Sequence, residues 1–234
     1  MMKKLIFALM IIAMLLVPVV LAKNEKQTEP LDKITFIHYK DGTVKEVGKA
    51  VSKETCYKLM GVKWSTLPVK YAINPTNTQG LPESFICSAV ITSAETWDAA
   101  TSKELFKNYA TCPIDYTAAY GVQDYKNAVT FGDYPTANVI AVTSVWYTRY
   151  GKQIVEFDQL YNTRFQWGDA EKNPAVMDLQ NIATHELGHA VGLSDLYSPT
   201  CTAVTMYGYS NNGEIQKRTL EKPDVTGLRM LYGA

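Results

Sequence analysis

Two histidines with a glutamate between them are the strongest chemical signal in the sequence. Residues His185-Glu186-Leu187-Gly188-His189 form a His-Glu-x-x-His motif. On a helix, histidines four residues apart face the same side, so both imidazoles can bind one cation. Tetrahedral Zn²⁺ prefers nitrogen ligands and, in catalytic sites, leaves one position for water. Glu186 follows the first histidine and is placed to accept a proton from that water.

A catalytic zinc site needs a third protein ligand, and we predict Asp195. Gly192 can end the helix and turn the chain back, and Asp195 follows three residues later. Only one other histidine exists, His38, and it is interpreted as a surface residue of an upstream strand. Glu214 and Glu221 are the other candidates, but Glu214 lies in a turn-like Asn-Asn-Gly-Glu stretch.

A helix from Asp178 to about Gly192 is predicted to carry the motif. Asp178 is a good N-cap and Gly192 suits a helix end. One face of this helix is apolar and should pack on the core, with Leu179, Ala183, Leu187, Ala190 and Val191. Burying histidine and glutamate on such a helix would be costly without a partner, which disfavours an accidental motif.

The remaining pattern predicts an α+β fold, because helices lie at both ends of a run of strands. A helix is expected from Pro82 through Trp97, and a final one from Pro223. Strands are expected at 69–73, 128–131, 139–147 and 154–160.

Residues 1–22 are predicted to be a secretory signal peptide. Lys3 and Lys4 precede an apolar run from Leu5 to Ala22, after which the chain becomes polar. An uncleaved membrane anchor is the alternative, because 18 apolar residues are just long enough to span a bilayer.

Residues 23–55 form a separate N-terminal segment ahead of a domain at 56–234. Within it, Ile34–Lys40, the turn Asp41-Gly42 and Thr43–Val47 predict a β-hairpin. A hairpin of this size does not fold alone. It therefore docks on the rest of the chain or acts as a short prosegment.

Charge and cysteine content narrow the function classes. The chain has 23 basic and 23 acidic residues and no block of like charges, which argues against a nucleic-acid-binding protein.

An even number of cysteines in an exported chain indicates two disulfides, formed by Cys56, Cys87, Cys112 and Cys201. Of the three connectivities, we favour Cys87–Cys112 and Cys56–Cys201.

The stretch from His185 to Asp195 resembles the extended zinc motif of the metzincin metalloproteases. Aspartate stands where most of them have a third histidine, as in the snapalysin-like branch. The segment around Met206 resembles the Met-turn that lies under the metal in that group. Further segments resemble the matrixins: 63–64 with 69–73 their first strand, 94–97 their first helix, 154–162 their edge strand and 224–233 their last helix. The resemblance covers Cys56 to the C-terminus and implies a twisted mixed sheet with an active-site helix, a Met-turn and a C-terminal helix.

Three departures from the matrixin pattern matter. No histidines remain for the second, structural zinc of matrix metalloproteinases, so we predict that it is absent. No cysteine-switch motif surrounds Cys56. Where some metzincins have a tyrosine two residues after the Met-turn methionine, this chain has Gly208, flanked by Tyr207 and Tyr209.

The resemblance implies a secreted endopeptidase with one catalytic zinc, Glu186 as general base, and extended peptides or proteins as substrates. A substrate strand would add to the sheet edge, which we place at 154–160. We expect a monomer without stable membrane association after signal removal. No EF-hand pattern supports a calcium site.

Three alternatives stay open. A zinc-bearing binding or adhesion module would need a blocked site, and His38 of the N-terminal hairpin is the one candidate blocking ligand. A metallohydrolase acting on bonds other than peptides is the second alternative. A purely structural helix would bind no metal.

Overall fold

The computed structural model describes residues 29–41 and 55–234. Its main sheet has six strands in the order β2-β3-β5-β4-β1-β8. These strands are β1 (Leu31–Lys40), β2 (Ala72–Ile73), β3 (Ala128–Gly132), β4 (Val139–Thr148), β5 (Ile154–Asn162) and β8 (Tyr209–Ser210). A separate two-stranded sheet pairs β6 (Trp167–Gly168) with β7 (Met177–Asp178).

Strands β3, β4 and β5 form the centre of the sheet. Strand β3 is parallel to β5, and β4 is antiparallel to it. The strands are rich in β-branched and aromatic residues, and nearly every side chain of β4 and β5 is buried. They therefore form a rigid platform under the helices.

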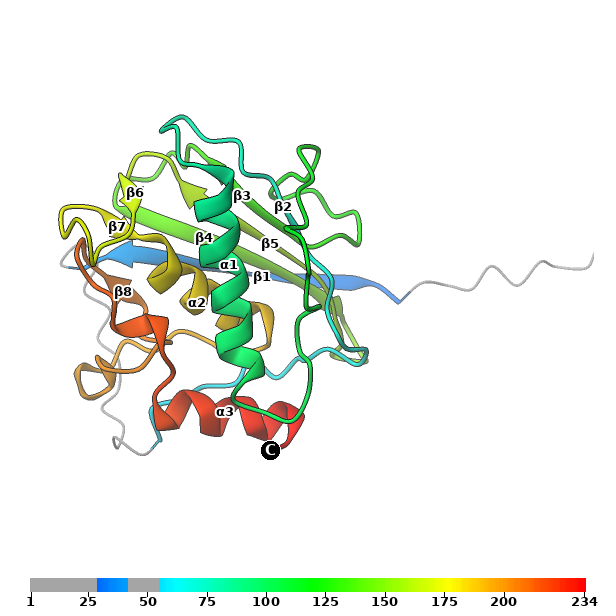
Figure 1. Cartoon of the computed structure of the whole chain (residues 1–234). Helices are drawn as coiled ribbons and strands as arrows, with labels where there is room; N and C mark the ends of the chain where they lie inside the picture. Colours follow the sequence, from blue (N-terminus) through cyan, green and yellow to red (C-terminus); the bar gives the residue numbers. More distant parts are fainter. Residues whose placement is uncertain (1–28, 42–54) are drawn as a thin grey trace, which may run out of the picture.

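Two helices pack together against this platform (Figure 1). They are α1 (Glu83–Asp98) and α2 (Leu179–Ala190), and the indole of Trp97 in α1 donates a hydrogen bond of 2.8 Å to the carbonyl of Thr184 in α2. The predicted apolar face of α2 is confirmed, since Leu179, Ala183, Leu187 and Ala190 are fully buried. A third helix, α3 (Lys222–Tyr232), follows near the C-terminus.

Two disulfides tie distant parts of the domain together, and both predicted pairings are confirmed. Cys87 of α1 is bonded to Cys112 in the following loop. Cys56, at the start of the domain, is bonded to Cys201 between α2 and β8. The short 3₁₀ helices η2 (Pro199–Cys201) and η3 (Gln216–Arg218) lie in the same loop-rich region.

The predicted element types are largely confirmed, but the predicted edge strand is wrong. Strand β5 lies between β3 and β4, so residues 154–160 are interior. Without β1, the exposed strand on this side of the sheet would be β4, and β1 pairs with it there. Both β4 and β5 mix apolar and polar residues and are buried along most of their length, so their composition does not distinguish an edge from a centre.

The first arm of the predicted hairpin forms β1, and it docks on the sheet, which was one of the two predicted alternatives. It pairs antiparallel with β4 from Leu31↔Thr148 to His38↔Ala141, and parallel with β8. The second arm, Thr43–Val47, and the predicted signal peptide lie outside the described residues. Within the described part of the chain, no helix has the length and apolar character needed to cross a membrane.

Candidate active site

Helix α2 carries three of the predicted site residues and is fixed at both ends. At its start, the carboxylate of Asp178 accepts a hydrogen bond of 2.8 Å from the Asn181 amide, as predicted for an N-cap. After its end, Gly192 has a φ of +99°, and a side chain there would lie 2.5 Å from the carbonyl oxygen of Val62. Only glycine fits this reversal, which returns the chain toward the helix and brings Asp195 back to it.

His185, His189 and Asp195 converge as a group whose ligand atoms all lie within 4.8 Å of one another. The Nε2 atoms of His185 and His189 lie 3.1 Å and 3.4 Å from Oδ1 of Asp195. All three residues are buried. The predicted triad is therefore brought together by a single helix and the turn that follows it.

The hydrogen bonds of the two histidines show that this triad suits a cation. The Nδ1 of His185 lies 2.7 Å from the Thr205 carbonyl oxygen, and the Nδ1 of His189 lies 2.8 Å from that of Leu193. A carbonyl oxygen only accepts, so each Nδ1 carries the proton and each Nε2 of a neutral ring presents a lone pair. The two Nε2 atoms and Asp195 Oδ1 are buried without a hydrogen-bond partner in the described structure. Two imidazole nitrogens and one carboxylate oxygen that converge in a buried site fit a metal ion, and this set of nitrogen and oxygen donors fits Zn²⁺.

Asp195 is held as an anion in this group. Burial alone would raise its pKa, but the neighbouring His189 and the contact with His185 keep the pKa of Asp195 well below its usual value. Its second oxygen accepts a hydrogen bond of 3.1 Å from the hydroxyl of Tyr197. Tyr197 therefore orients the carboxylate, a role that the sequence did not reveal.

Met206 lies beneath α2, as expected for a Met-turn. A side chain at Gly188 would lie 2.3 Å from the Met206 sulfur, so the close approach requires glycine in the helix. The turn is anchored by Asp224 of α3, whose carboxylate accepts hydrogen bonds from the amides of Thr205 and Met206. Since the Thr205 carbonyl holds His185, this anchor also fixes the ring.

Glu186 faces β4 and β1 rather than the core of the helix pair. The Thr143 hydroxyl in β4 donates a hydrogen bond of 2.5 Å to Oε2, and Nδ1 of His38 lies 3.1 Å from Oε1. Burial raises the pKa of Glu186 to about 7, and the neighbouring His189 and Thr143 partly oppose that rise. A carboxyl with a pKa near neutrality can both accept and return a proton.

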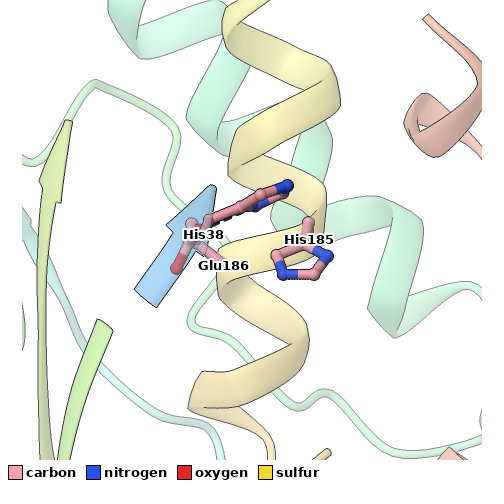
Figure 2. A group of neighbouring side chains, drawn as sticks. All are labelled: His38, His185 and Glu186. Atoms are coloured by element: carbon pink, nitrogen blue, oxygen red, sulfur yellow. Dashed lines mark hydrogen bonds and ion pairs between the residues drawn. The ribbon is translucent and has the colours of Figure 1, made fainter. Parts of the chain in front are cut away.

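The prediction that His38 is a surface residue is wrong. Its side chain is 1% exposed, and its ring lies 4.0 Å from the ring of His185 (Figure 2). Figure 2 shows His38 reaching from β1 toward Glu186 on the helix. An isolated strand with alternating residues contains no signal for this contact, because it depends on pairing with β4 more than 100 residues away.

A buried lysine is the second residue that the sequence did not reveal. Lys217 of η3 is fully buried, and its Nζ donates to the carbonyls of Tyr207 and Tyr209 and to Ser210 Oγ. Its Nζ also lies 3.3 Å from Nε2 of His38. It therefore fixes β8 and the segment before it against the site.

The other candidate ligands lie elsewhere. Glu221 caps α3 in a reciprocal capping box with Asp224, and Glu214 lies within hydrogen-bonding distance of Asn211. Gly208 accommodates the ring of Tyr197, because a side chain there would lie 2.4 Å from it. The aromatic group near Met206 thus comes from Tyr197, Tyr207 and Tyr209, in which the ring of Tyr209 packs against the other two.

Comparison with known proteins agrees with this arrangement. The chain is 24% identical over 174 residues to the hatching enzyme of Paracentrotus lividus, which covers 74% of this chain. The alignment covers 27% of that protein, so this chain spans well under half the length of the relative it matches. The family model for matrixin matches residues 63–233, which include the helix, the converging triad and the Met-turn. The chain therefore belongs to the matrixin family.

Proposed function

We propose that this chain is a secreted zinc-dependent endopeptidase whose metal is held by His185, His189 and Asp195. The observation that carries the proposal is the convergence of three buried, unpartnered acceptor atoms beside a buried glutamate. Family membership implies zinc. When bound, zinc lowers the pKa of a water molecule and polarises a carbonyl group.

Glu186 is the general base in this proposal. Its carboxylate converges with His185 and His38, with Oε1 in contact with His38, while Oε2 is held by Thr143. The carboxylate accepts a proton from the attacking water and returns it to the leaving amine. Thr143 is a positioning residue, because its hydrogen bond orients the carboxylate without touching the reacting atoms.

An extended peptide is the substrate shape that fits this site. The edge of β4 passes beside Glu186, and β8 lies on the other side of the site. A peptide lying between them can pair its backbone with both, which gives affinity with little demand on sequence. Two disulfides support export, because such bonds persist in oxidising compartments. N-terminal sequencing of the secreted chain tests removal of residues 1–22.

The test of the activity is cleavage of an unfolded protein by the purified, zinc-loaded chain. We expect cleavage to stop when a chelator removes zinc and to fall by about 10²–10⁴-fold in Glu186→Gln, as for loss of a general base. Zinc analysis and circular dichroism confirm that the variant is loaded and folded. A Glu186→Gln variant as active as the parent would exclude Glu186 as the base.

One observation favours a zinc-bearing binding module as the alternative. Strand β1 covers the site, so His185, Glu186 and His189 are fully buried. A chain in which β1 never leaves would bind zinc without cleaving peptides.

A further inference from the structure

Strand β1 lies where an extended substrate would have to bind. It runs beside β4 and past α2, as the blue strand of Figure 1 shows. Along most of its length it is antiparallel to β4, and at Tyr39 and Lys40 it is also parallel to β8. Because a peptide added to a sheet edge uses the same backbone groups, a substrate and β1 cannot occupy β4 together.

His38 occupies the proton-accepting side of Glu186. A lysine ammonium only donates, so Nε2 of His38 accepts from Lys217 and its Nδ1–H donates to Oε1 of Glu186. Oε2 already accepts from Thr143. Both carboxylate oxygens therefore have a donor while β1 is in place, and His38 occupies the oxygen that would otherwise accept a proton from water.

Phe36 covers the other side of the site. Its ring stacks on the ring of His189, with centroids 3.9 Å apart and planes 7° from parallel. Phe36 and His38 are two residues apart, so they point to the same face of the strand, toward α2. A register shift between His38 and Tyr39 interrupts the pairing with β4 next to the site. The β1 group in contact with Glu186 is the His38 side chain.

The attachment of β1 is compatible with release. Only His38 of this strand is buried, and the rest is half-buried or exposed. All four cysteines of the chain are bonded to one another, so no disulfide holds the strand. An exposed ion pair between Asp32 and Arg149 holds its other end.

We propose that β1 is an autoinhibitory strand: it takes the place of a substrate between β4 and β8, with His38 engaging Glu186 and Phe36 covering His189. This inference rests on the proposed peptidase function. Peptides reach the site only when β1 leaves the edge of β4. The substrate class that replaces it is an extended peptide that adopts the direction of β1.

The first test weakens the docking of β1 in the full, zinc-loaded chain. Phe36→Ala/His38→Ala removes both contacts with the site, and we expect cleavage of a quenched fluorescent peptide to rise at least about tenfold. Lys107→Ala is the control, because Lys107 is an exposed lysine outside β1 that pairs at the surface with Glu104. We expect it to cleave at the parent rate.

The second test fixes β1 in place. The hydroxyls of Thr35 in β1 and Ser144 in β4 lie 3.1 Å apart at paired positions, so Thr35→Cys/Ser144→Cys can form a disulfide across the two strands. Mass spectrometry confirms the bond. We expect the bonded form to cleave at least about tenfold more slowly than either single-cysteine variant. If β1 had only a structural role, neither the double alanine variant nor the disulfide would change the rate of cleavage.

A binding measurement separates the failure of this inference from the failure of the peptidase proposal. A fluorescent peptide hydroxamate binds an accessible zinc site without being cleaved. We expect it to bind Phe36→Ala/His38→Ala at least about tenfold more tightly than the parent. We expect its affinity for the disulfide-bonded form to be the lowest of the three. Equal binding to all three would overturn autoinhibition whether or not the chain cleaves peptides. The expected order of binding without any cleavage would uphold the covering role of β1 and exclude the peptidase.

Discussion

Strand β4 has two antiparallel neighbours, β5 and β1, and they are held in different ways. In β5 all but one residue is buried, and Phe157 and Tyr161 are fully enclosed by the core. In β1 only His38 is buried. Backbone pairing with β4 is at least as extensive for β1 as for β5.

The difference shows that sheet pairing alone does not make a strand part of the core. Side chains of β5 pack on both faces, so its removal would expose the interior of the domain. The inward side chains of β1 instead contact Glu186 and His189, the proposed general base and a proposed metal ligand. One strand stabilises the fold, and the other covers the site.

The largest expected contrast is in stability. Phe157→Ala in β5 should lower the free energy of unfolding by about 3–5 kcal/mol, because it leaves a cavity against Phe106 and the core. Phe36→Ala in β1 should lower it by no more than about 1.5 kcal/mol, the value of a half-exposed ring contact. Urea unfolding followed by tryptophan fluorescence measures both. Equal losses would mean that β1 is part of the core, which would contradict its release.

The active-site helix could be predicted from local sequence because its geometry is local. A spacing of four places His185 and His189 on one face, Asp178 begins the helix, and Gly192 permits the reversal that returns Asp195. The pairings of the cysteines also agreed with the structure. For the helix, neighbouring residues determine the geometry. For the cysteines, only three connectivities exist.

The covering strand could not be predicted, because its position depends on distant pairing. His38 stands between Ile37 and Tyr39 in β1, so the local pattern does not show which way its side chain faces, and its contact with Glu186 follows from register with β4. The order of β4 and β5 was missed for the same reason. Lys217 and Thr143 reach the site from separate elements and belong to no local motif.

The burial of β5 should also make the free energy of unfolding depend on pH through one carboxyl group, that of Asp158. Burial raises the pKa of Asp158 to about 7, although the Gly121 amide donates to it. In the unfolded chain this group ionises near its ordinary value of 3.8. Between these two pKa values the unfolded state loses the proton first, so the stability of the parent falls as pH rises.

The variant Asp158→Asn removes this contribution. We expect its stability relative to the parent to increase by roughly 2 kcal/mol between pH 5 and pH 7, measured by urea unfolding at each pH. Other groups titrate in both proteins and cancel in the difference. Parallel stability curves would show that the Asp158 carboxyl is not held in its protonated form by β5.

The smallest expected effect concerns the exposed end of β1. The Arg149 guanidinium donates two hydrogen bonds to Asp32, at 3.0 Å and 2.8 Å, and both side chains are partly exposed. Such a pair contributes about 0.2–1 kcal/mol. If it helps to hold β1 on β4, Asp32→Ala should raise peptide cleavage by less than about fivefold.

The control is a similar ion pair away from β1. Arg164 donates two hydrogen bonds to Asp133, also at the surface, so Asp133→Ala should leave cleavage at the parent rate. Salt screens exposed charges, so the gain in Asp32→Ala should shrink as ionic strength rises. A gain of the same size in both variants would point to a general charge effect. A gain confined to Asp32→Ala would show that this exposed ion pair helps to keep β1 over the site. If β1 were permanently docked, loss of the pair would not change the rate of cleavage.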